Sequence, residues 1–528
     1  MSPAIPRLVV AGTASGVGKT TATVAIARAL RARGLRVALF KCGPDYLDPT
    51  YHGRAVAGTS HNLDGWMMGR DAVLSTFAAE AAGADVALIE GVMGLFDGAS
   101  PTGEEGSTAE IAKWLEAPVA LVVDASGMAR SVAALVQGFA GFDPALRVAA
   151  VVCNQVGSRG HLDILRQAQA HRSPPVIGGL PRDEAQRFPE RHLGLRTADE
   201  AAIPEGRFDH WGAQAEAWIG LDALLEIARR APALPAAYDA EEAPALPAAS
   251  DAATSAAAPA ASDATAAPAG AAAAAGAAPR RARIGVAFDE AFHFYYADNL
   301  RRLEAAGAEL VRFSPIRDAR LPDVDALYLG GGYPEVHAER LTENAALRAE
   351  IRAFAGGGGP IYAECGGLMY LTEAIRTLDG RAHPMVGLVP AEAVMCEKLQ
   401  ALGYVEVETQ ARTILGGAGL RFRGHQFRYS ELRPAAPATP PSPAAEAPLP
   451  IEHAYSVRRR RGGQVAREGY RAQNVLASYV HAHWASNPLV PEGLVASAAA
   501  HRKGREEKIN DLPNHSGANW ATTKERAR

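Results

Sequence analysis

One cysteine lies where a predicted strand gives way to a predicted helix. In Gly359–Leu371 (GPIYAECGGLMYL) apolar residues precede Cys365, two glycines follow it, and apolar residues then recur at helical spacing. A thiol on such a turn projects from the sheet, and the positive end of the following helix is expected to lower its pKa. The backbone N–H of Gly366, with a second one from the glycines around Gly331, can bind an oxyanion. The pattern predicts a nucleophilic cysteine.

A cysteine nucleophile needs a general base, and His481 fits this role. It follows an apolar run near the end of the chain, in ASYVHAHW (Ala477–Trp484). His483 could serve instead, although the adjacent tryptophan favours a packing role for it. The alternative for Cys365 is an inert buried thiol, the commonest fate of a lone cysteine. The glycines at the turn and the late histidine favour the reactive interpretation.

A second set of chemical residues opens the chain, in the stretch GTASGVGKTT. A short apolar run enters this glycine-containing loop, and a predicted helix follows it. Backbone N–H groups of such a loop cradle phosphates, the lysine neutralises them, and the threonine hydroxyl suits Mg²⁺. The loop is one residue longer than the usual spacing, so a simple glycine turn is the alternative. The residues expected to contact a nucleotide are Gly12, Thr13, Gly16, Gly18, Lys19 and Thr20.

Acidic residues follow two further apolar runs. Asp45 and Asp48 come after RVALFK, and Glu90 ends DVALIE, with Asp97 just beyond it. Ligands of open parallel sheets bind outside the carboxyl ends of the strands. We therefore predict Mg²⁺ held by Thr20, Asp45 and Glu90 beside the phosphates. The alternative, strongest for Asp48 and Asp97, is that these acids are solvated loop residues.

The strand and helix pattern predicts an α/β protein with two doubly wound, mainly parallel sheets. Two more apolar runs, PVALVVDAS and VAAVVCNQVG, predict buried parallel strands in the first half. The second run ends in Asn154, whose amide suits an adenine edge, although a turn-forming role is equally compatible. The first half is thus predicted to be a nucleotide-binding domain of the P-loop type.

Breaks in composition divide the 528 residues into parts. Alanine and proline dominate two segments that bury too little to offset the entropy of ordering them. The predicted parts are a synthetase domain over 1–231, a linker over 232–282, a second domain over 283–497 with an insertion at about 434–450, and a polar tail over 498–528.

Bulk properties set the expected environment. A net charge of −4 gives no reason to expect nucleic acid or an anionic membrane as a partner. The four cysteines show no metal-binding or disulfide spacing, and neither a signal peptide nor a membrane-spanning stretch is evident. We expect a cytoplasmic protein with reduced cysteines. Its oligomeric state is open, and a homodimer is one of the possibilities.

Several motifs together resemble the cobyrinic acid a,c-diamide synthase family. The similar stretches are GTASGVGKTT, KCGPDYLDP, EGVMGLFDG, RHLGL, LGGGYPE, YAECGGLMYL, GHQFRYS and ASYVHAHW. The resemblance covers nearly the whole chain apart from the linker, the insertion and the tail. It implies an ATPase domain related to dethiobiotin synthetase, followed by a class I glutaminase-like domain.

This resemblance implies an enzyme that amidates the a and c carboxylates of cobyrinic or hydrogenobyrinic acid, using ATP, Mg²⁺ and L-glutamine. Cys365 and His481 would release ammonia from glutamine, with Gly331 and Gly366 as the oxyanion hole. The first domain would form an acyl phosphate, near Lys41, Asp45, Asp48 and Asp97. Ammonia would attack this acyl phosphate inside the protein, away from water.

Two departures and two rival functions remain. Many class I glutaminases carry a carboxylate two residues after the base, where this chain has His483, and Gln426 and Arg428 replace residues common in the family. A related tetrapyrrole amidase or cobyric acid synthase is the nearest alternative, although GPDYLDP favours the a,c family. A P-loop regulatory switch with an inactive glutaminase is the other, but such switches usually carry a lysine where Ala14 stands.

Overall fold

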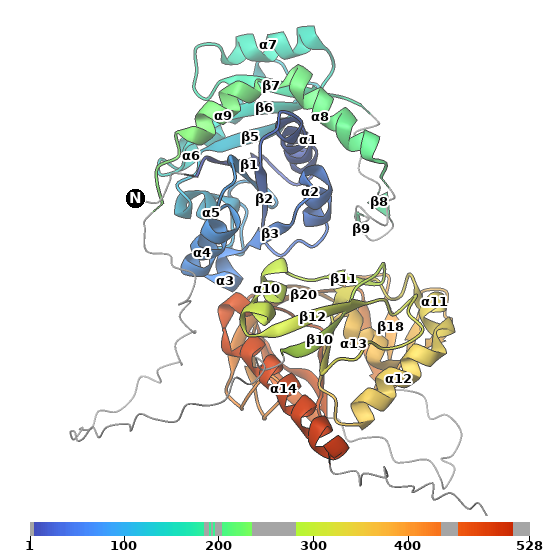
Figure 1. Ribbon diagram of the computed structural model, residues 1–528. Coiled ribbons are helices and arrows are strands. Elements are labelled where there is room, and N and C mark those ends of the chain that lie inside the picture. Colours follow the sequence, from blue (N-terminus) through green and yellow to red (C-terminus); the bar gives the residue numbers. More distant parts are fainter. Residues whose placement is uncertain are drawn as a thin grey trace, which may run out of the picture.

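The computed structural model describes residues 5–183, 190–191, 194–195, 203–234, 281–434 and 452–510. These residues form two α/β domains (Figure 1). The predicted linker and insertion lie almost entirely outside the described residues, as do the end of the predicted tail and part of the RHLGL motif.

The described part of the first domain contains a parallel sheet of seven strands in the order β3-β2-β4-β1-β5-β6-β7. The strands are β1 (Arg7–Gly12), β2 (Val37–Cys42), β3 (Ser60–Leu63), β4 (Val86–Glu90), β5 (Val119–Asp124), β6 (Val148–Val156) and β7 (Val176–Pro181). A small pair, β8 (Glu190–Arg191) and β9 (Gly194–Leu195), stands apart from this sheet.

Helices cover both faces of this sheet, as the doubly wound prediction requires. One face carries α1 (Lys19–Ala32), α2 (Asp48–Val56), α8 (Glu205–Trp218) and α9 (Leu221–Arg229). The other carries α4 (Arg70–Glu80), α5 (Thr108–Trp114), α6 (Ser131–Phe142) and α7 (Arg159–Gln169), with the short α3 (Gly65–Met68) beside α4.

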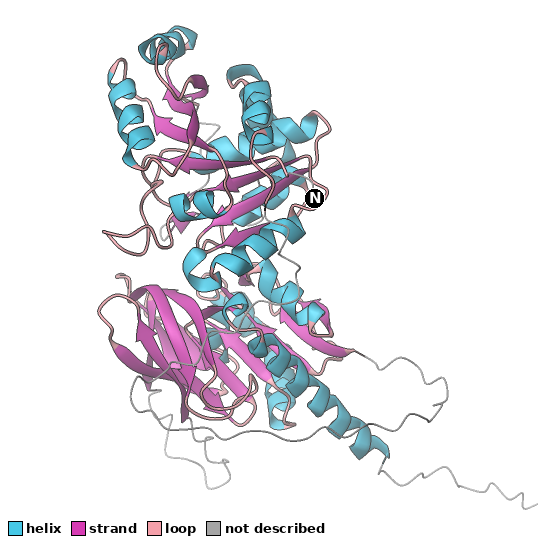
Figure 2. Ribbon diagram, turned by 90° about the vertical axis from the view of Figure 1, so that its left-hand side faces the viewer, coloured by secondary structure: helices cyan, strands magenta, loops and turns pink. Residues whose placement is uncertain are grey.

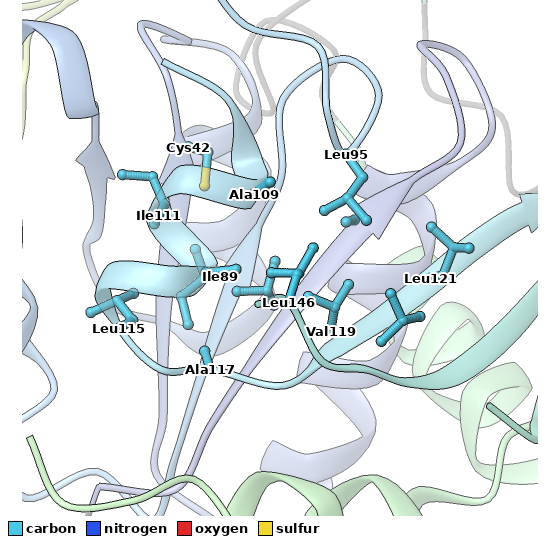
Figure 3. Close-up of a cluster of buried hydrophobic side chains, with 14 of the residues drawn as sticks. Cys42, Ile89, Leu95, Ala109, Ile111, Leu115, Ala117, Val119, Leu121 and Leu146 are labelled. Atoms are coloured by element: carbon cyan, nitrogen blue, oxygen red, sulfur yellow. The ribbon is translucent and has the colours of Figure 1, made fainter. Parts of the chain in front are cut away.

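The sequence of β1 explains why the sheet is buried on both sides. Val9 and Ala11 belong to one hydrophobic cluster, whereas Leu8 and Val10 belong to the cluster on the opposite face. Successive side chains of a strand point to opposite faces, so an unbroken apolar run fills two cores. Figure 3 shows part of the first cluster, in which Ile89 of β4 lies near Ile111 of α5 and near Leu115, which follows that helix.

The second domain contains a mixed sheet, which differs in part from the mainly parallel prediction. Ten described strands run in the order β12-β10-β13-β15-β24-β23-β22-β19-β20-β25. The parallel part comprises β12 (Ala308–Phe313), β10 (Ala282–Ala287), β13 (Ala326–Leu329), β15 (Ile361–Glu364) and β24 (Val475–Ser478). The antiparallel part adds β23 (Val465–Ala472), β22 (Glu452–Arg459), β19 (Ala401–Thr409), β20 (Arg421–Arg428) and β25 (His481–His483), visible at the lower left of Figure 2.

Smaller elements complete this domain. The short strands are β11 (Phe292–Phe294), β14 (Gly331–Gly332), β16 (Thr372–Arg376), β17 (Ala382–Pro384), β18 (Val389–Met395) and β21 (Ser430–Pro434). The helices are α10 (Ala297–Ala305), α11 (Ala338–Glu343), α12 (Ala345–Gly356), α13 (Gly366–Leu371), the 3₁₀ turn η2 (Trp484–Ser486) and α14 (Leu489–Asn510).

Helix α14 corrects the predicted start of the polar tail at 498. The helix continues to Asn510, and Val490, Leu494 and Ala498 are buried at helical spacing against the core. Further along, His501 hydrogen-bonds the carbonyl oxygen of Asp325 at 3.0 Å. No described helix combines the length and the apolar character needed to cross a membrane.

The two domains contact each other directly through folded surfaces. The hydroxyl of Tyr404 donates to Asp64 at 2.7 Å, and Arg423 donates to the carbonyl oxygen of Trp66 at 2.9 Å. The rings of Trp66 and Tyr404 lie 4.8 Å apart. Tyr46 of the first domain packs against Phe294 and other rings of the second domain. These contacts fix the domains without using the linker.

Candidate active site

A cavity of about 730 Å³ lies at the carboxyl ends of the strands in the first domain. It brings together most of the residues predicted for nucleotide, metal and acyl phosphate. The predicted residues that line this cavity are Gly16, Gly18, Lys19, Thr20, Lys41, Asp45, Asp48, Glu90 and Asn154. The topology explains this convergence, because β1, β2, β4 and β6 all end at the same edge of one parallel sheet.

The glycine-containing loop is held in shape by Asn154. The side-chain amide of Asn154 donates to the carbonyl oxygen of Val17 at 3.0 Å. A Cβ at Gly18, whose φ is +93°, would lie 2.0 Å from that amide nitrogen. Lys19 donates to the carbonyl oxygen of Ala14 at 3.0 Å, and burial, followed by repulsion from Lys41, lowers its pKa. Asn154 thus braces the loop, and its predicted contact with adenine stays a prediction.

Three predicted residues, Gly12, Thr13 and Asp97, lie outside the lining of this cavity, and their contacts with nucleotide or substrate stay predictions. A Cβ at Gly12 would lie 2.7 Å from a methyl group of Val17, so this glycine permits close packing beneath the loop. The backbone N–H of Thr13 donates to Val122 in the neighbouring strand at 3.2 Å. Asp97 accepts from the N–H of Gly94 at 3.0 Å and stabilises a local turn.

A buried network of charges forms the floor of the cavity. The ammonium of Lys41 lies 2.5 Å from Asp48 and 2.7 Å from Glu90, and His52 lies 2.6 Å from the other oxygen of Glu90. Burial alone would raise the pKa of Glu90, but Lys41 and His52 lower it below its usual value. The Glu90 carboxylate therefore stays ionised. The sequence interpretation missed His52, since one histidine in a helix carries no distinguishing pattern.

The predicted magnesium ligands lie around the same floor. The hydroxyl of Thr20 donates to Glu90 at 2.7 Å, and Asp45 accepts from the N–H groups of Leu47 and Asp48 just before α2. Within the described ranges, no group of three or more His, Cys, Asp or Glu side chains is arranged to hold a metal alone. Hard oxygen donors beside a phosphate loop still fit Mg²⁺, which keeps several waters and substrate oxygens.

A second cavity, of about 310 Å³, contains both Cys365 and His481. Cys365 joins β15 to α13 with φ 47° and ψ −99°, in a region that non-glycine residues rarely adopt. Such strain costs about 1–3 kcal/mol and persists where the surroundings enforce it, commonly at active sites. The sharp turn predicted from the sequence is therefore present.

Both groups of this pair are neutral in the structure. Burial raises the pKa of Cys365 to about 12 and lowers the pKa of His481 to about 3. The predicted lowering of the thiol pKa by the helix is therefore wrong, because desolvation outweighs a helix of only six residues. Nδ1 of His481 is buried without a hydrogen-bond partner among the described residues. Its imidazole stacks on that of His425, with ring centroids 5.0 Å apart.

The glycines predicted to form the oxyanion hole lie close to the thiol and to its base. A Cβ at Gly331 would lie 2.4 Å from the ring of His481, so this residue leaves room for the base. A Cβ at Gly366 would lie 3.0 Å from the amide nitrogen of Gly332, and Gly332 lines the cavity whereas Gly331 does not. Gly332 is therefore a further candidate, beside Gly331, for the second N–H donor of the oxyanion hole.

Other residues of this cavity had no role assigned from sequence. Arg428 lies over the ring of Tyr479 at 4.3 Å, and its charge acts to lower the pKa of Cys365, against the larger effect of burial. Tyr46 reaches across from the first domain, with its ring centroid 5.3 Å from that of His481. Stretches such as GHQFRYS and KCGPDYLDP contain these residues, but only the tertiary structure places them beside the thiol. His483 packs against Tyr296, in keeping with the packing interpretation.

The two cavities adjoin across the domain interface. Asp45, Leu47 and Val92 line both of them. A small molecule released near Cys365 would therefore meet the floor of the nucleotide cavity after passing these shared side chains. The arrangement suits two half-reactions joined by a short internal path.

Comparison with known families agrees with this two-part site. The family model for the CobQ/CobB/MinD/ParA nucleotide binding domain matches residues 8–195. The model for the CobB/CobQ-like glutamine amidotransferase domain matches residues 283–489. The chain therefore joins a nucleotide-binding domain to a glutamine amidotransferase domain.

Similar full-length proteins define the family more closely. A cobyrinate a,c-diamide synthase of Leptospira interrogans is 48% identical, covering 94% of this chain and 99% of the relative. One from Syntrophotalea carbinolica is 46% identical, covering 92% and 96%. A hydrogenobyrinate a,c-diamide synthase of Streptomyces coelicolor is 41% identical, covering 93% and 97%. The chain belongs to the a,c-diamide synthase family and is an amidating enzyme of the ligase class.

Proposed function

We propose that the protein converts the a and c carboxylates of cobyrinic or hydrogenobyrinic acid into amides, using ATP, Mg²⁺ and glutamine, in the cytoplasm. The observation that supports this most is the shared wall of the two cavities at Asp45, Leu47 and Val92. A site for phosphoryl transfer beside a site for ammonia release is what such a reaction requires.

In the glutaminase half, Cys365 attacks the side-chain amide carbon of glutamine. The thiol proton passes to His481, which delivers it to the departing ammonia, and water then hydrolyses the thioester to glutamate. The N–H group of Gly366, with that of Gly331 or Gly332, stabilises the oxyanion of each tetrahedral intermediate. Because both groups start neutral, the proton moves within the pair as the carbon–sulfur bond forms.

In the synthetase half, the substrate carboxylate attacks the γ-phosphorus of ATP, giving an acyl phosphate and ADP. Lys19 and the loop N–H groups bind the phosphates. Thr20 and Glu90 would hold Mg²⁺, which neutralises phosphate charge when bound. Ammonia then attacks the acyl carbon and phosphate leaves, forming the amide. Lys41 is held by Asp48 and Glu90, so it keeps a fixed positive charge at this edge of the sheet.

Mass spectrometry of cobyrinic and hydrogenobyrinic acids, incubated with the protein, ATP, Mg²⁺ and glutamine, tests the proposal. We expect a diamide of at least one acid, with one glutamate and one ADP formed per amide. Amides at other side chains would point to cobyric acid synthase chemistry. If neither acid gains an amide, the substrate assignment is wrong. Size measurement in solution separately tests the homodimer prediction.

A regulatory P-loop switch makes the opposite prediction for glutamine. An inactive glutaminase domain would release no ammonia, with or without a corrinoid acid. We expect ammonia release that rises when the corrinoid acid and ATP are present. A matched measurement on Cys365→Ala gives the background.

A further inference from the structure

A third cavity, of about 460 Å³, lies between the two domains. Its first-domain wall includes Val92 and Met93, and its second-domain wall includes Leu402 and Tyr404. Met93 and Leu402 are 42% and 70% exposed. Large apolar side chains left open on both sides of a cavity indicate a surface that takes an apolar ligand.

Three consecutive arginines, Arg459, Arg460 and Arg461, line the same cavity. Arg460 pairs with Glu105 across the domain interface, yet its Nη1 is buried with no partner among the described residues. Arg459 and Arg461 are exposed, and neither has an acidic partner within the part of the chain that the structure describes. Unpaired guanidinium groups beside an apolar wall indicate a ligand that carries carboxylates.

This cavity shares lining residues with both the nucleotide cavity and the thiol cavity. Val92 lines all three cavities, and Met93 lines both this one and the nucleotide cavity. A carboxyl group on a ligand bound here can therefore reach the floor of the nucleotide cavity. Ammonia from the thiol cavity arrives at the same junction.

We infer that this cavity is the docking site of the acid substrate, an apolar macrocycle bearing several carboxylates. The ring lies against the apolar wall, and Arg459 and Arg461 bind carboxylates that are not reacting. This inference rests on the proposed function and assigns its substrate site. The cavity volume falls in the range of about 300–1,000 Å³ typical of small-molecule sites.

The arginines also account for two rounds of amidation at one site. A planar guanidinium binds any accessible carboxylate in a bidentate manner, so it does not require one fixed orientation of the ring. After the first amide forms, the product can rebind with its other carboxylate toward the junction at Val92. Arg459 and Arg461 are therefore anchoring residues and do not touch the reacting atoms.

The test replaces both anchoring arginines in the double variant Arg459→Gln/Arg461→Gln. The single variant Arg458→Gln is the control. Arg458 lies on the same strand and is exposed, but it does not line the cavity. The dissociation constant of cobyrinic acid is measured by titration with a non-hydrolysable ATP analogue present. We expect the dissociation constant to rise about tenfold or more in the double variant, since each lost contact is a charged hydrogen bond. Arg458→Gln should stay within about twofold of the unmodified protein.

Glutaminase activity measured without corrinoid acid and the dissociation constant of the ATP analogue serve as controls for folding, and both should be unchanged. An unchanged dissociation constant in the double variant overturns the docking site, as does an equal rise in Arg458→Gln. The titration measures binding whether or not an amide forms. Failure of the docking site is therefore distinct from failure of the proposed function, which appears as an absence of amide with the unmodified protein.

Discussion

The nucleotide cavity and the thiol cavity keep their buried reactive groups in opposite states of charge. Both place reactive groups at the carboxyl ends of parallel strands, where a turn leads to a helix. In the nucleotide cavity, buried Lys41 and Glu90 stay charged because they lie 2.7 Å apart. In the thiol cavity, burial is the largest effect on the pKa of both Cys365 and His481, it outweighs the charge of Arg428, and it keeps both groups neutral.

Under the proposed mechanism, this difference follows from the chemistry of each half-reaction. Phosphoryl transfer needs fixed charges to balance the phosphates, so the protein supplies an ion-pair network that holds them. Amide cleavage by a thiol needs a proton to move, so a neutral pair that exchanges one proton is sufficient. Substitutions in the two cavities should therefore have separable effects.

The largest effect is expected from Cys365→Ala. Glutamine-dependent amidation should fall by about 10⁴-fold or more, as is typical when a nucleophile is removed. Activity with added ammonium salt should remain, because the thiol supplies only ammonia. Amidation assays with glutamine and with ammonium salt measure the two activities separately. Cys396→Ala is the control, because Cys396 is a half-buried cysteine of the same domain. Loss of both activities would mean that the two cavities do not act separately.

Lys19→Ala should lower amidation with either nitrogen source by roughly 10²–10³-fold, the usual cost of one preorganised electrostatic contact. Glutaminase activity without ATP should persist. Lys113→Ala is the control: this half-buried lysine of α5 pairs with Asp143 and does not line the nucleotide cavity. Near-normal turnover with ammonium salt would refute the phosphate-loop assignment.

Glu90→Gln should also lower both amidation activities, and in addition should destabilise the first domain. The change leaves Lys41 with only Asp48 as an acidic partner at the floor of the cavity. Breaking a buried ion pair typically costs about 3–5 kcal/mol. Denaturant unfolding of Glu90→Gln and Lys19→Ala measures the contrast, and equal stability of the two variants would contradict the charge-network interpretation.

The pH dependence of glutamine hydrolysis should differ from that of amidation with ammonium salt, by less than the effects of the substitutions above. Since the pKa values of Cys365 and His481 are about 12 and about 3, neither group changes protonation between pH 6 and 9. The kcat/KM for glutamine hydrolysis should therefore vary by only about twofold there. Amidation with ammonium salt should instead rise with pH, because only the free base is nucleophilic. An acidic limb near pH 7 in glutamine hydrolysis would show that the thiol pKa is lowered.

The smallest effect is expected from the linker, which lies outside the described residues. Deletion of Pro244 to Gly270 should leave the ratio of glutamine consumed to amide formed unchanged. Domain docking depends on contacts such as Tyr404 with Asp64, and loop-closure entropy changes by only about 0.6 kcal/mol per doubling of length. Glutamine consumed without amide formation, with both half-reactions intact, would show that the linker seals the path between the cavities.

The sequence by itself determined the local chemistry of the protein. Apolar runs ending in Lys41, Glu90 and Asn154 predict strands whose ends meet, and the glycines around Cys365 predict its sharp turn. These inferences succeed because strand period, turn residues and parallel topology depend on short stretches of chain.

Only the tertiary structure decided which neighbours these residues have. The pKa of Cys365 depends on burial by residues far apart in sequence, and desolvation reverses the effect expected from its own helix. The role of Asn154 as a brace, and the close approach of Gly331 to the ring of His481, depend on contacts of a few ångströms between separate elements. Strand β22 ends at Arg459, and Arg461 lies in the turn that follows it. Neither stretch carries a periodic signal of its placement at the interface, because a side chain's environment is set by packing and not by spacing.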